Sequence, residues 1–470
     1  MRQIINSCVF LFTVLLSAQE TPSSLSLQEA IDYALENNRT SKNAALDIDA
    51  AEQQKWETTA TGLPQIKADV DYQNFLKQQV SLLPAAAFDP LGSIRQLGDY
   101  YDLTDRQIKD LPAAPQGFLP LTFGTKQNVS ASATLSQLIF DGSYIVALQS
   151  AKVFLQISEN AKKKTDLEVR KSVIDAYGNV LLAEESLDIL ERNMEVLDKN
   201  LFEVTKIFEN GLGEEESVEQ LKITISGVES NLNNVKRLRT LSYQMLNIVL
   251  ALPINAEVSL TDNLQTLTEE NISISLIETD FKVENTIDYR IAENDKRIKD
   301  LMLKLEKSKA LPTIGSFLNA GYSAFSDEFT FLNKDQQWFG SAVIGVSLDI
   351  PIFSSFGRSA ATKRAAINVD KAETDLLETE QRLRLQINSA KSDYQFAIEE
   401  YRNKEENLRL AERIEAKNQT KFFEGISTSF ELRQAQTQLY TAQQEFLQAM
   451  LNVITAKAGL ETIINQPNLN

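Results

Sequence analysis

The chain has 470 residues, of which 43% are hydrophobic and 24% are charged, a composition typical of folded proteins. Its formal net charge of −18 argues against binding to nucleic acid, which requires basic patches. The chain has no histidine and one cysteine, Cys8, which excludes the usual zinc sites and histidine- or thiol-based catalysis. We therefore expect a protein without a cofactor that is not an enzyme.

Residues 1–18 form a predicted signal peptide. One cation, Arg2, precedes an apolar run from Ile4 to Leu16, and small residues follow where a signal peptidase could cut. A single membrane-spanning anchor is the alternative, but it needs about 20 apolar residues. We therefore expect a secreted protein whose mature chain contains no cysteine.

Paired carboxylates that could serve catalysis do occur, such as Asp69 and Asp71 in the segment KADVDY. Paired acids can hydrolyse glycosides when both face one substrate. Here they alternate with Ala68, Val70 and Tyr72, and a period of two indicates the polar face of a strand. A hydrolase that works with carboxylates alone is therefore the weakest alternative.

Three landmarks recur in the same order in both halves of the chain: a Leu-Pro pair, a phenylalanine that begins a long helical pattern, and a glycine. They are Pro64, Phe140 and Gly211 in the first half, and Pro312, Phe353 and Gly425 in the second. The phenylalanine and the glycine lie 71 and 72 positions apart, whereas the proline and the phenylalanine lie 76 and 41 apart. The first half thus carries an insertion of 35 residues (76 − 41). We predict two structural repeats, with Pro64 and Pro312 at equivalent strand entries.

Each repeat contains alternating apolar residues that indicate two strands, and apolar residues spaced three and four apart that indicate two long helices joined at the glycine. Repeat 1 is predicted over 19–253, with a helix, strands at about 65–83 and 126–140, and a helical hairpin over 143–252. Repeat 2 is predicted over 286–470, with a helix, strands at about 313–325 and 339–353, and a helical hairpin over 356–465. The segment 254–285 breaks the heptads and connects the repeats, with room for a short strand.

Four strands with an apolar face are too few to close a barrel, and open strand edges are not tolerated in lipid. Closure must come from other chains, so that two copies would give eight strands and three copies twelve. The alternative is a soluble β cap on a dimeric coiled coil, which makes the protein a secreted, non-transporting scaffold. The inserted loop at 84–120 is expected to be external, either as a binding contact or as a mobile loop.

With these features the chain resembles the TolC-like outer-membrane factor (outer membrane efflux protein) family over essentially all of the mature sequence. The stretches that carry the resemblance are SLSLQEAIDYALENN at 24–38, GLPQIKADVDY, ALPTIGSFLNAGY, FGTKQNVSASATLSQLIFDGSYIVALQSAK and GISTSFELRQAQTQLYTAQ. The resemblance implies a homotrimer in the bacterial outer membrane. Three chains would share a 12-stranded transmembrane β-barrel, continued by an α-helical coiled-coil barrel across the periplasm, with 254–285 at its equator.

The same resemblance implies a channel-tunnel that exports small molecules or proteins as the exit duct of a tripartite efflux or type I secretion system. Its implied partners are a periplasmic adaptor (membrane fusion) protein, an inner-membrane pump or ABC transporter, and outer-membrane lipid. In this family the tips of the helical hairpins contact the adaptor. The implied contact residues are Gly211, Glu214, Glu215, Glu216, Ser217, Gly425 and Thr428.

The resemblance also implies a tunnel constriction and selectivity site. The family's narrowest ring consists of two acids, six and nine positions after the tip glycine. Gly425 is followed at these offsets by Glu431, which matches, and by Gln434, which departs from the pattern. Acids at both tips would attract cations to the tunnel mouth, or else they offset the dipole at a helix N-terminus.

Overall fold

The computed structural model describes residues 23–100 and 112–465 of the chain. The signal peptide predicted over 1–18, with Cys8, lies outside the described residues, as does part of the 84–120 loop. The chain divides into two compact units, and each unit combines parts of both predicted repeats. A helical unit comprises Met1–Lys55, Gln149–Leu303 and Lys363–Asn470, and a sheet unit comprises Trp56–Leu148 and Lys304–Thr362.

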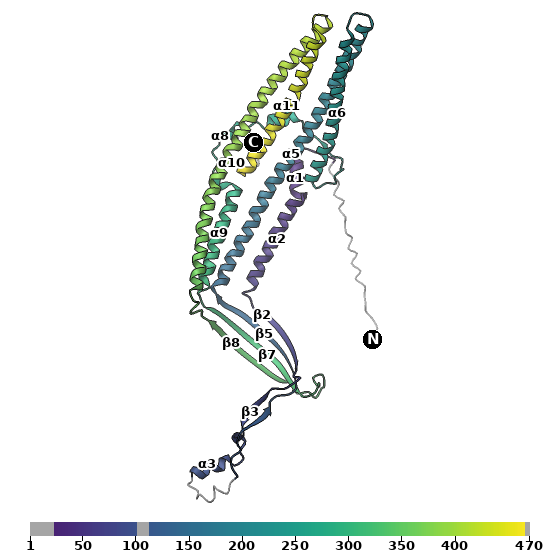
Figure 1. The fold of residues 1–470 in the computed structure, drawn as a ribbon. Coiled ribbons are helices and arrows are strands. Elements are labelled where there is room, and N and C mark those ends of the chain that lie inside the picture. Colours follow the sequence, from purple (N-terminus) through teal and green to yellow (C-terminus); the bar gives the residue numbers. More distant parts are fainter. Residues whose placement is uncertain (1–22, 101–111, 466–470) are drawn as a thin grey trace, which may run out of the picture. The chain divides into compact units, whose positions relative to one another are not determined.

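The sheet unit contains one antiparallel sheet of four long strands in the order β2-β5-β7-β8 (Figure 1). The strands are β2 (Gln65–Asn74), β5 (Gln127–Asp141), β7 (Thr313–Ser326) and β8 (Phe339–Asp349). Each repeat therefore contributes one antiparallel pair. Among the described strands, β2 and β8 pair on one side only, so both outer edges of this sheet are open.

The strand predicted over 65–83 is wrong in its second part. β2 ends at Asn74, and β3 (Val80–Pro84) pairs with β4 (Phe118–Thr122) in a separate two-stranded sheet. Alternation of apolar and polar residues fails between β2 and β3, where the sequence reads FLKQQ. The insertion also contains the short helices η1 (Ala85–Phe88) and α3 (Gly92–Tyr100), so it carries structure of its own.

The strand predicted over 339–353 ends earlier, at Asp349. The physical reason is Pro351, which has no amide hydrogen to donate to the β ladder and restricts the residue before it. β5 and β7 begin and end within one residue of the strands predicted at 126–140 and 313–325.

Four long helices dominate the helical unit. In chain order they are α5 (Gly142–Glu209), α6 (Glu215–Val249), α10 (Gly357–Phe423) and α11 (Ser429–Ile464). They form two helical hairpins, where the sequence predicted hairpins over 143–252 and 356–465. α5 has 68 residues and is therefore roughly 100 Å long. Within 23–100 and 112–465, no helix has both the length and the apolar character needed to cross a membrane.

The remaining elements precede the strand pairs in the sequence or lie within the connector. α1 (Leu27–Asn37) and α2 (Arg39–Ala60) precede the first strand pair, and α9 (Ile287–Ser308) precedes the second. The segment predicted as the connector holds β6 (Ser259–Leu260), α7 (Leu264–Glu270), α8 (Ile274–Glu278) and η2 (Val283–Asn285). β6 pairs in parallel with β1 (Ser24–Leu25), so the connector does contain a short strand.

The main core of the helical unit forms where α1, the connector and the long helices meet. The fully buried Tyr177 hydroxyl of α5 lies 2.8 Å from Asp262 Oδ2 and 3.0 Å from the Leu25 carbonyl oxygen. The same Asp262 oxygen accepts the Leu27 amide, at 2.6 Å, at the start of α1. Burial, and then the hydrogen bond with Asp262, raises the pKa of Tyr177, so this hydroxyl stays protonated. One buried cluster thus joins α5, the connector and the start of α1.

We predict that Tyr177→Phe destabilises this junction. The change removes one of the two hydrogen bonds that Asp262 Oδ2 accepts, leaving that of the Leu27 amide, and should cost about 1–3 kcal/mol because the acceptor is charged. Thermal unfolding followed by circular dichroism in detergent should show a lower midpoint. Tyr243→Phe is the matched control, because its hydroxyl donates to Glu184 at 2.7 Å at a partly exposed site and its loss should cost less. Equal midpoints for both variants would contradict the role given to Tyr177.

Candidate functional site

One face of the four-stranded sheet is apolar from one edge to the other. Alternate residues of a strand share a face, so residues paired across the strands form rows on it. The rows are Ile66, Leu135, Leu318 and Ile344; then Ala68, Ala133, Ala320 and Ala342; then Val70, Ala131, Tyr322 and Gly340. Ile66, Val70 and Ile344 are 79%, 75% and 78% exposed in the single chain. An apolar face of this extent marks an interaction surface.

The opposite face of the sheet is polar. Its rows are Lys67, Thr134, Asn319 and Val343, followed by Asp69, Ser132, Gly321 and Ser341. Lys67 Nζ lies 2.7 Å from Asp69 Oδ1. Asp69 and Asp71 therefore belong to the polar face of β2, as their alternation with apolar residues predicted. Apolar residues on one face and polar residues on the other are the pattern of membrane β-strands.

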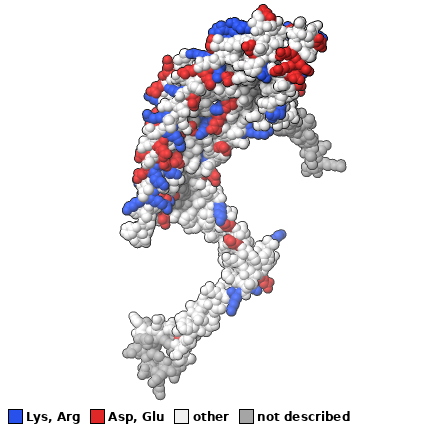
Figure 2. Space-filling view, turned by 45° about the horizontal axis from the view of Figure 1, so that its top comes forward, with Lys and Arg blue, Asp and Glu red and all other residues white. Residues whose placement is uncertain are grey.

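Charged side chains are concentrated on the helical unit. Figure 2 shows Lys, Arg, Asp and Glu gathered over the helices, with only a few on the sheet region. In the part of the chain that the structure describes, no cluster of three or more potential metal ligands is present. The three adjacent glutamates at 214–216 therefore form no preassembled metal site.

The two sequence-predicted strand entries have the same local geometry. β2 begins directly after Pro64, and β7 begins directly after Pro312. In each case the leucine before the proline closes a turn at the end of the preceding helix. The Leu63 amide donates to the Ala60 carbonyl oxygen at 3.0 Å, and the Leu311 amide donates to the Ser308 carbonyl oxygen at 2.9 Å.

Both helical hairpins turn through the same glycine-dependent motif. Gly211 follows α5 with φ of +72°, and Gly425 follows α10 with φ of +73°. Each glycine amide donates to the carbonyl oxygen three residues before it, at 2.8 Å for Gly211 and 3.0 Å for Gly425. The amide of the next residue donates to the carbonyl oxygen five residues before it, at 3.0 Å for Leu212 and 2.8 Å for Ile426. These are Schellman motifs, in which a left-handed residue ends the helix. Leu212 and Ile426 are 82% and 71% exposed, so each tip presents an apolar side chain that the sequence reasoning missed.

The second tip continues into a complete capping box at the start of α11. The Glu431 amide donates to Thr428 Oγ1 at 3.3 Å, and the Thr428 amide donates to Glu431 Oε2 at 3.0 Å. The Ser427 hydroxyl also donates to Glu431 Oε2, at 2.6 Å. These bonds, Ser427 first, lower the pKa of Glu431, so the cap stabilises the helix above the ordinary carboxyl pKa and weakens as the pH falls through the lowered one. The pattern Thr-x-x-Glu could have revealed this box in the sequence.

The first tip lacks this box. Glu214 occupies the N-cap of α6 without a side-chain hydrogen bond, and Ser217 stands where the second repeat has Glu431. The Ser217 amide donates instead to the Glu214 carbonyl oxygen at 3.1 Å. Glu215 and Glu216 lie in the first turn of α6, where carboxylates offset the helix dipole. The structure thus favours a local helix-start role for these glutamates.

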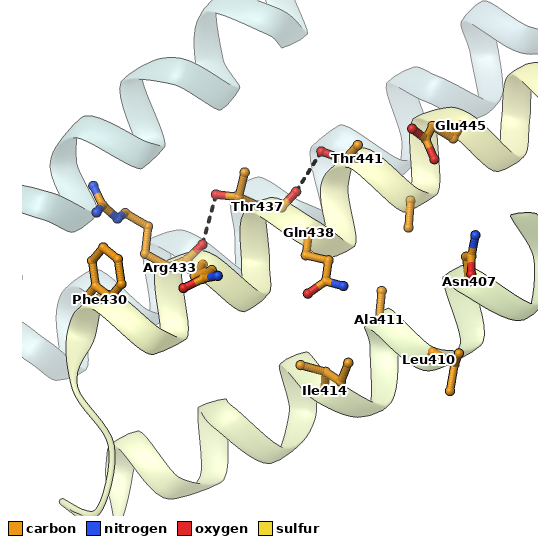
Figure 3. A pocket seen from close by; sticks show the side chains of 12 residues that line it. Asn407, Leu410, Ala411, Ile414, Phe430, Arg433, Thr437, Gln438, Thr441 and Glu445 are labelled. Carbon is orange, nitrogen blue, oxygen red and sulfur yellow. Dashed lines mark hydrogen bonds between the residues drawn. The ribbon is translucent and has the colours of Figure 1, made fainter.

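Glu431 and Gln434 lie three positions apart on α11. Gln434 lines a groove of about 930 Å³ between α10 and α11, whereas Glu431 is not among the lining residues (Figure 3). Leu410 and Ile414 of α10 form one wall of the groove. Phe430, Arg433, Thr437 and Gln438 of α11 line the other side.

Polar contacts join the two hairpins, and the sequence reasoning missed them. Asn193 Nδ2 donates to Gln443 Oε1 at 2.8 Å, and Gln419 Nε2 donates to Asn200 Oδ1 at 3.4 Å. Asn193 and Asn200 are buried and lie seven residues apart in the apolar seam of α5. Polar residues at heptad spacing are a readable signal, since they specify how helices pair.

We predict that Gly425→Ala destabilises the second tip, because an L-residue is strained at a φ of +73° even though no atom lies within 4 Å of the added Cβ. Amide hydrogen exchange at residues 421–432 should become several-fold faster. Gly227→Ala is the matched control, because Gly227 lies inside α6 with equally open space and alanine favours a helix. Unchanged exchange at the tip would show that the left-handed turn is not what holds it.

The sequence matches the family described as "Outer membrane efflux protein" over residues 30–251 and 302–466. A curated relative is the alkaline protease secretion protein AprF of Pseudomonas aeruginosa, 24% identical over 159 residues. That match covers 33% of this chain and about a third, 32%, of the relative.

Two solved outer-membrane proteins have the same fold. The outer membrane protein VceC of Vibrio cholerae has a TM-score of 0.68 at 14% identity, covering 94% of this chain and 96% of its own. The MtrE outer membrane channel of Neisseria gonorrhoeae, in its open state, has a TM-score of 0.69 at 16% identity, covering 94% and 89%. The two structures show the fold, and the family match extends over most of the sequence. The chain therefore belongs to the outer membrane efflux protein family.

Proposed function

We propose that three copies of this chain form a channel-tunnel, the outer-membrane exit duct of a tripartite efflux or type I secretion system. The observation that carries the proposal is the sheet with an apolar face and two open edges, β2 and β8. In lipid every backbone donor and acceptor must be paired, so the open edges require further strands. Three copies would supply twelve strands, with the apolar rows facing lipid.

The polar face of the sheet supports a water-filled lumen. Lys67, Asp69, Asn319 and the serines and threonines of these rows would line it, and a hydrated lumen tolerates such groups, whereas lipid does not. The long helices would continue the duct through the periplasm. At roughly 100 Å, α5 has the reach that this arrangement requires.

The hairpin tips are the proposed contact with a periplasmic adaptor, which would couple the duct to an inner-membrane pump or ABC transporter. Leu212 and Ile426 offer exposed apolar side chains at equivalent positions, and Glu214, Glu215 and Glu216 add negative charge beside the first. Spreading of the hairpins would open the duct. The Asn200–Gln419 contact between hairpins would then have to break.

The comparisons with known proteins support two kinds of cargo. AprF is named as a secretion protein, which supports protein export, whereas the family description names efflux. Both kinds of transport use the same exit geometry, so the proposal covers small molecules and proteins. The runner-up, a non-transporting coiled-coil scaffold with β caps, leaves the apolar sheet face without a lipid partner.

We predict that the detergent-extracted protein from the outer-membrane fraction has a mass of about three chains, because four strands per chain and twelve per barrel require three copies. Light scattering with the detergent contribution subtracted measures this mass. A monomer or dimer recovered without detergent would contradict the shared barrel and favour the scaffold.

We predict that Glu431→Gln lowers cation preference in planar bilayers, whereas Gln434→Glu raises it, since a ring of three carboxylates attracts cations. Glutamine also serves at the third position of a capping box, so Glu431→Gln removes charge while it can keep the cap. Thr428→Ala is the matched control, because it removes the cap and keeps the charge. Reversal potentials in asymmetric KCl that stay unchanged in both charge variants would remove the constriction role.

A further inference from the structure

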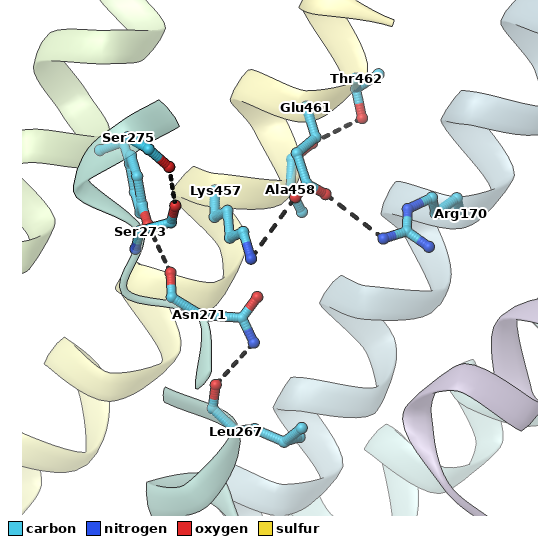
Figure 4. A network of polar contacts seen from close by, with 10 residues as sticks. Arg170, Leu267, Asn271, Ser273, Ser275, Lys457, Ala458, Glu461 and Thr462 are labelled. Atoms are coloured by element: carbon cyan, nitrogen blue, oxygen red, sulfur yellow. Dashed lines mark hydrogen bonds and ion pairs between the residues drawn. The ribbon is translucent and has the colours of Figure 1, made fainter. Parts of the chain in front are cut away.

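The buried end of α11 contains charged side chains that the proposed transport does not use. Lys457 and Glu461 lie one turn apart, and their side chains are only 7% and 6% exposed. Arg170 of α5, at 16%, approaches the same carboxylate from the other side (Figure 4). Two cations therefore share one carboxylate inside the helical unit.

Neither cation is well satisfied by that carboxylate. Lys457 Nζ lies 3.7 Å from Glu461 Oε1, which is beyond hydrogen-bond distance. Arg170 Nη2 lies 3.5 Å from Glu461 Oε2, at the limit of a hydrogen bond. The Arg170 Nε atom is buried and has no partner among the described residues. A buried cation without good partners is costly, so these donors require another acceptor.

These donors border a cavity of about 250 Å³. A cavity of this volume accommodates a small ion with some water. Two further carboxylates, Asp262 and Glu270, line it. Asp262 already accepts the Leu27 amide and lies beside the Tyr177 hydroxyl, and Glu270 is exposed. Neither forms an ion pair with Arg170 or Lys457, so Glu461 is the one carboxylate of the lining within ion-pair distance of the two cations.

We infer that Arg170 and Lys457 form a binding site for a small anion, such as a halide or a short carboxylate. The anion would accept from Lys457 Nζ and Arg170 Nε and so join the last turns of α11 to α5. Glu461 orients the two cations but competes with the ligand through its own charge. The site lies in the helical unit, away from both tips, and is independent of the transported cargo.

Bromide tests the site directly, because it substitutes for chloride and scatters anomalously. Crystals of the full-length, detergent-purified protein grown in sodium bromide should show an anomalous peak within about 3.5 Å of Lys457 Nζ, the contact range of a charge-assisted bond to a large anion. Acetate and phosphate at equal ionic strength then distinguish the ligand classes by their ability to displace the peak. No peak, or a peak at exposed lysines only, would overturn the proposal.

Variants separate anion binding from an ordinary ion pair. Chloride should raise the thermal midpoint relative to gluconate at equal ionic strength, and Lys457→Met or Arg170→Gln should abolish this difference. Lys171→Met is the matched control, because Lys171 adjoins Arg170 but forms its own i,i+4 pair with Asp175 at a partly exposed site. It should keep the chloride response.

Glu461→Gln gives opposite expectations under the two interpretations. If an anion binds, loss of the competing carboxylate should tighten chloride binding about tenfold, since a like charge near the ligand is removed. If Glu461 only pairs with the two cations, the variant should be less stable in chloride and in gluconate alike, and the proposal fails. Arg170→Gln gives a second result where Lys457→Met does not fold.

Discussion

The fold depends on one constraint, the need of every backbone amide and carbonyl group in lipid to find a partner. A soluble sheet can leave its edges to water, but a sheet with an apolar outer face cannot. β2 and β8 leave unpaired backbone groups at the two edges of a four-stranded sheet. In the proposed assembly, several copies would close one barrel and so pair these groups, and the long helices would then form the walls of a duct rather than the core of a domain.

The two repeats share the same backbone turn at their hairpin tips but differ in the side chains around it. Gly211 and Gly425 end their helices with the same hydrogen bonds, and both are followed by an exposed apolar residue. The helix starts differ: Thr428 and Glu431 form a reciprocal cap, whereas Glu214 has no side-chain bond. The turn is thus held by backbone geometry, and the flanking side chains are free to take on different local roles.

The spacing of apolar residues predicted the long helices and most strands, because it reflects which side chains are buried when a single chain folds. The predicted strand bounds were wrong between Asn74 and Val80, where the alternation of apolar and polar residues stops together with the ladder, and at Pro351, where proline ends the strand. The site was less predictable. The repeat spacing located the glycine turns, and the family resemblance pointed to Glu431. The Thr-x-x-Glu pattern of the capping box was readable but overlooked, whereas no sequence pattern indicated the bond from the Ser427 hydroxyl to the Glu431 carboxylate. The cluster of Arg170 with Lys457 and Glu461 joins residues nearly 300 positions apart, which no local pattern reveals.

Packing inside the helical unit changes character along its length. The core near Tyr177 and Tyr394 is mainly apolar, although it encloses the hydrogen bonds of both tyrosine hydroxyls, whereas the contacts between hairpins toward the tips pass through Asn193, Asn200 and the amide of buried Gln436. Apolar burial gives stability that is lost gradually, but a buried polar pair must either find its partner or reach water. Separating helices along polar contacts therefore costs less free energy than separating them along apolar contacts, because water replaces the lost hydrogen-bond partners. A duct whose tips must part while its middle stays closed is served by this order of packing.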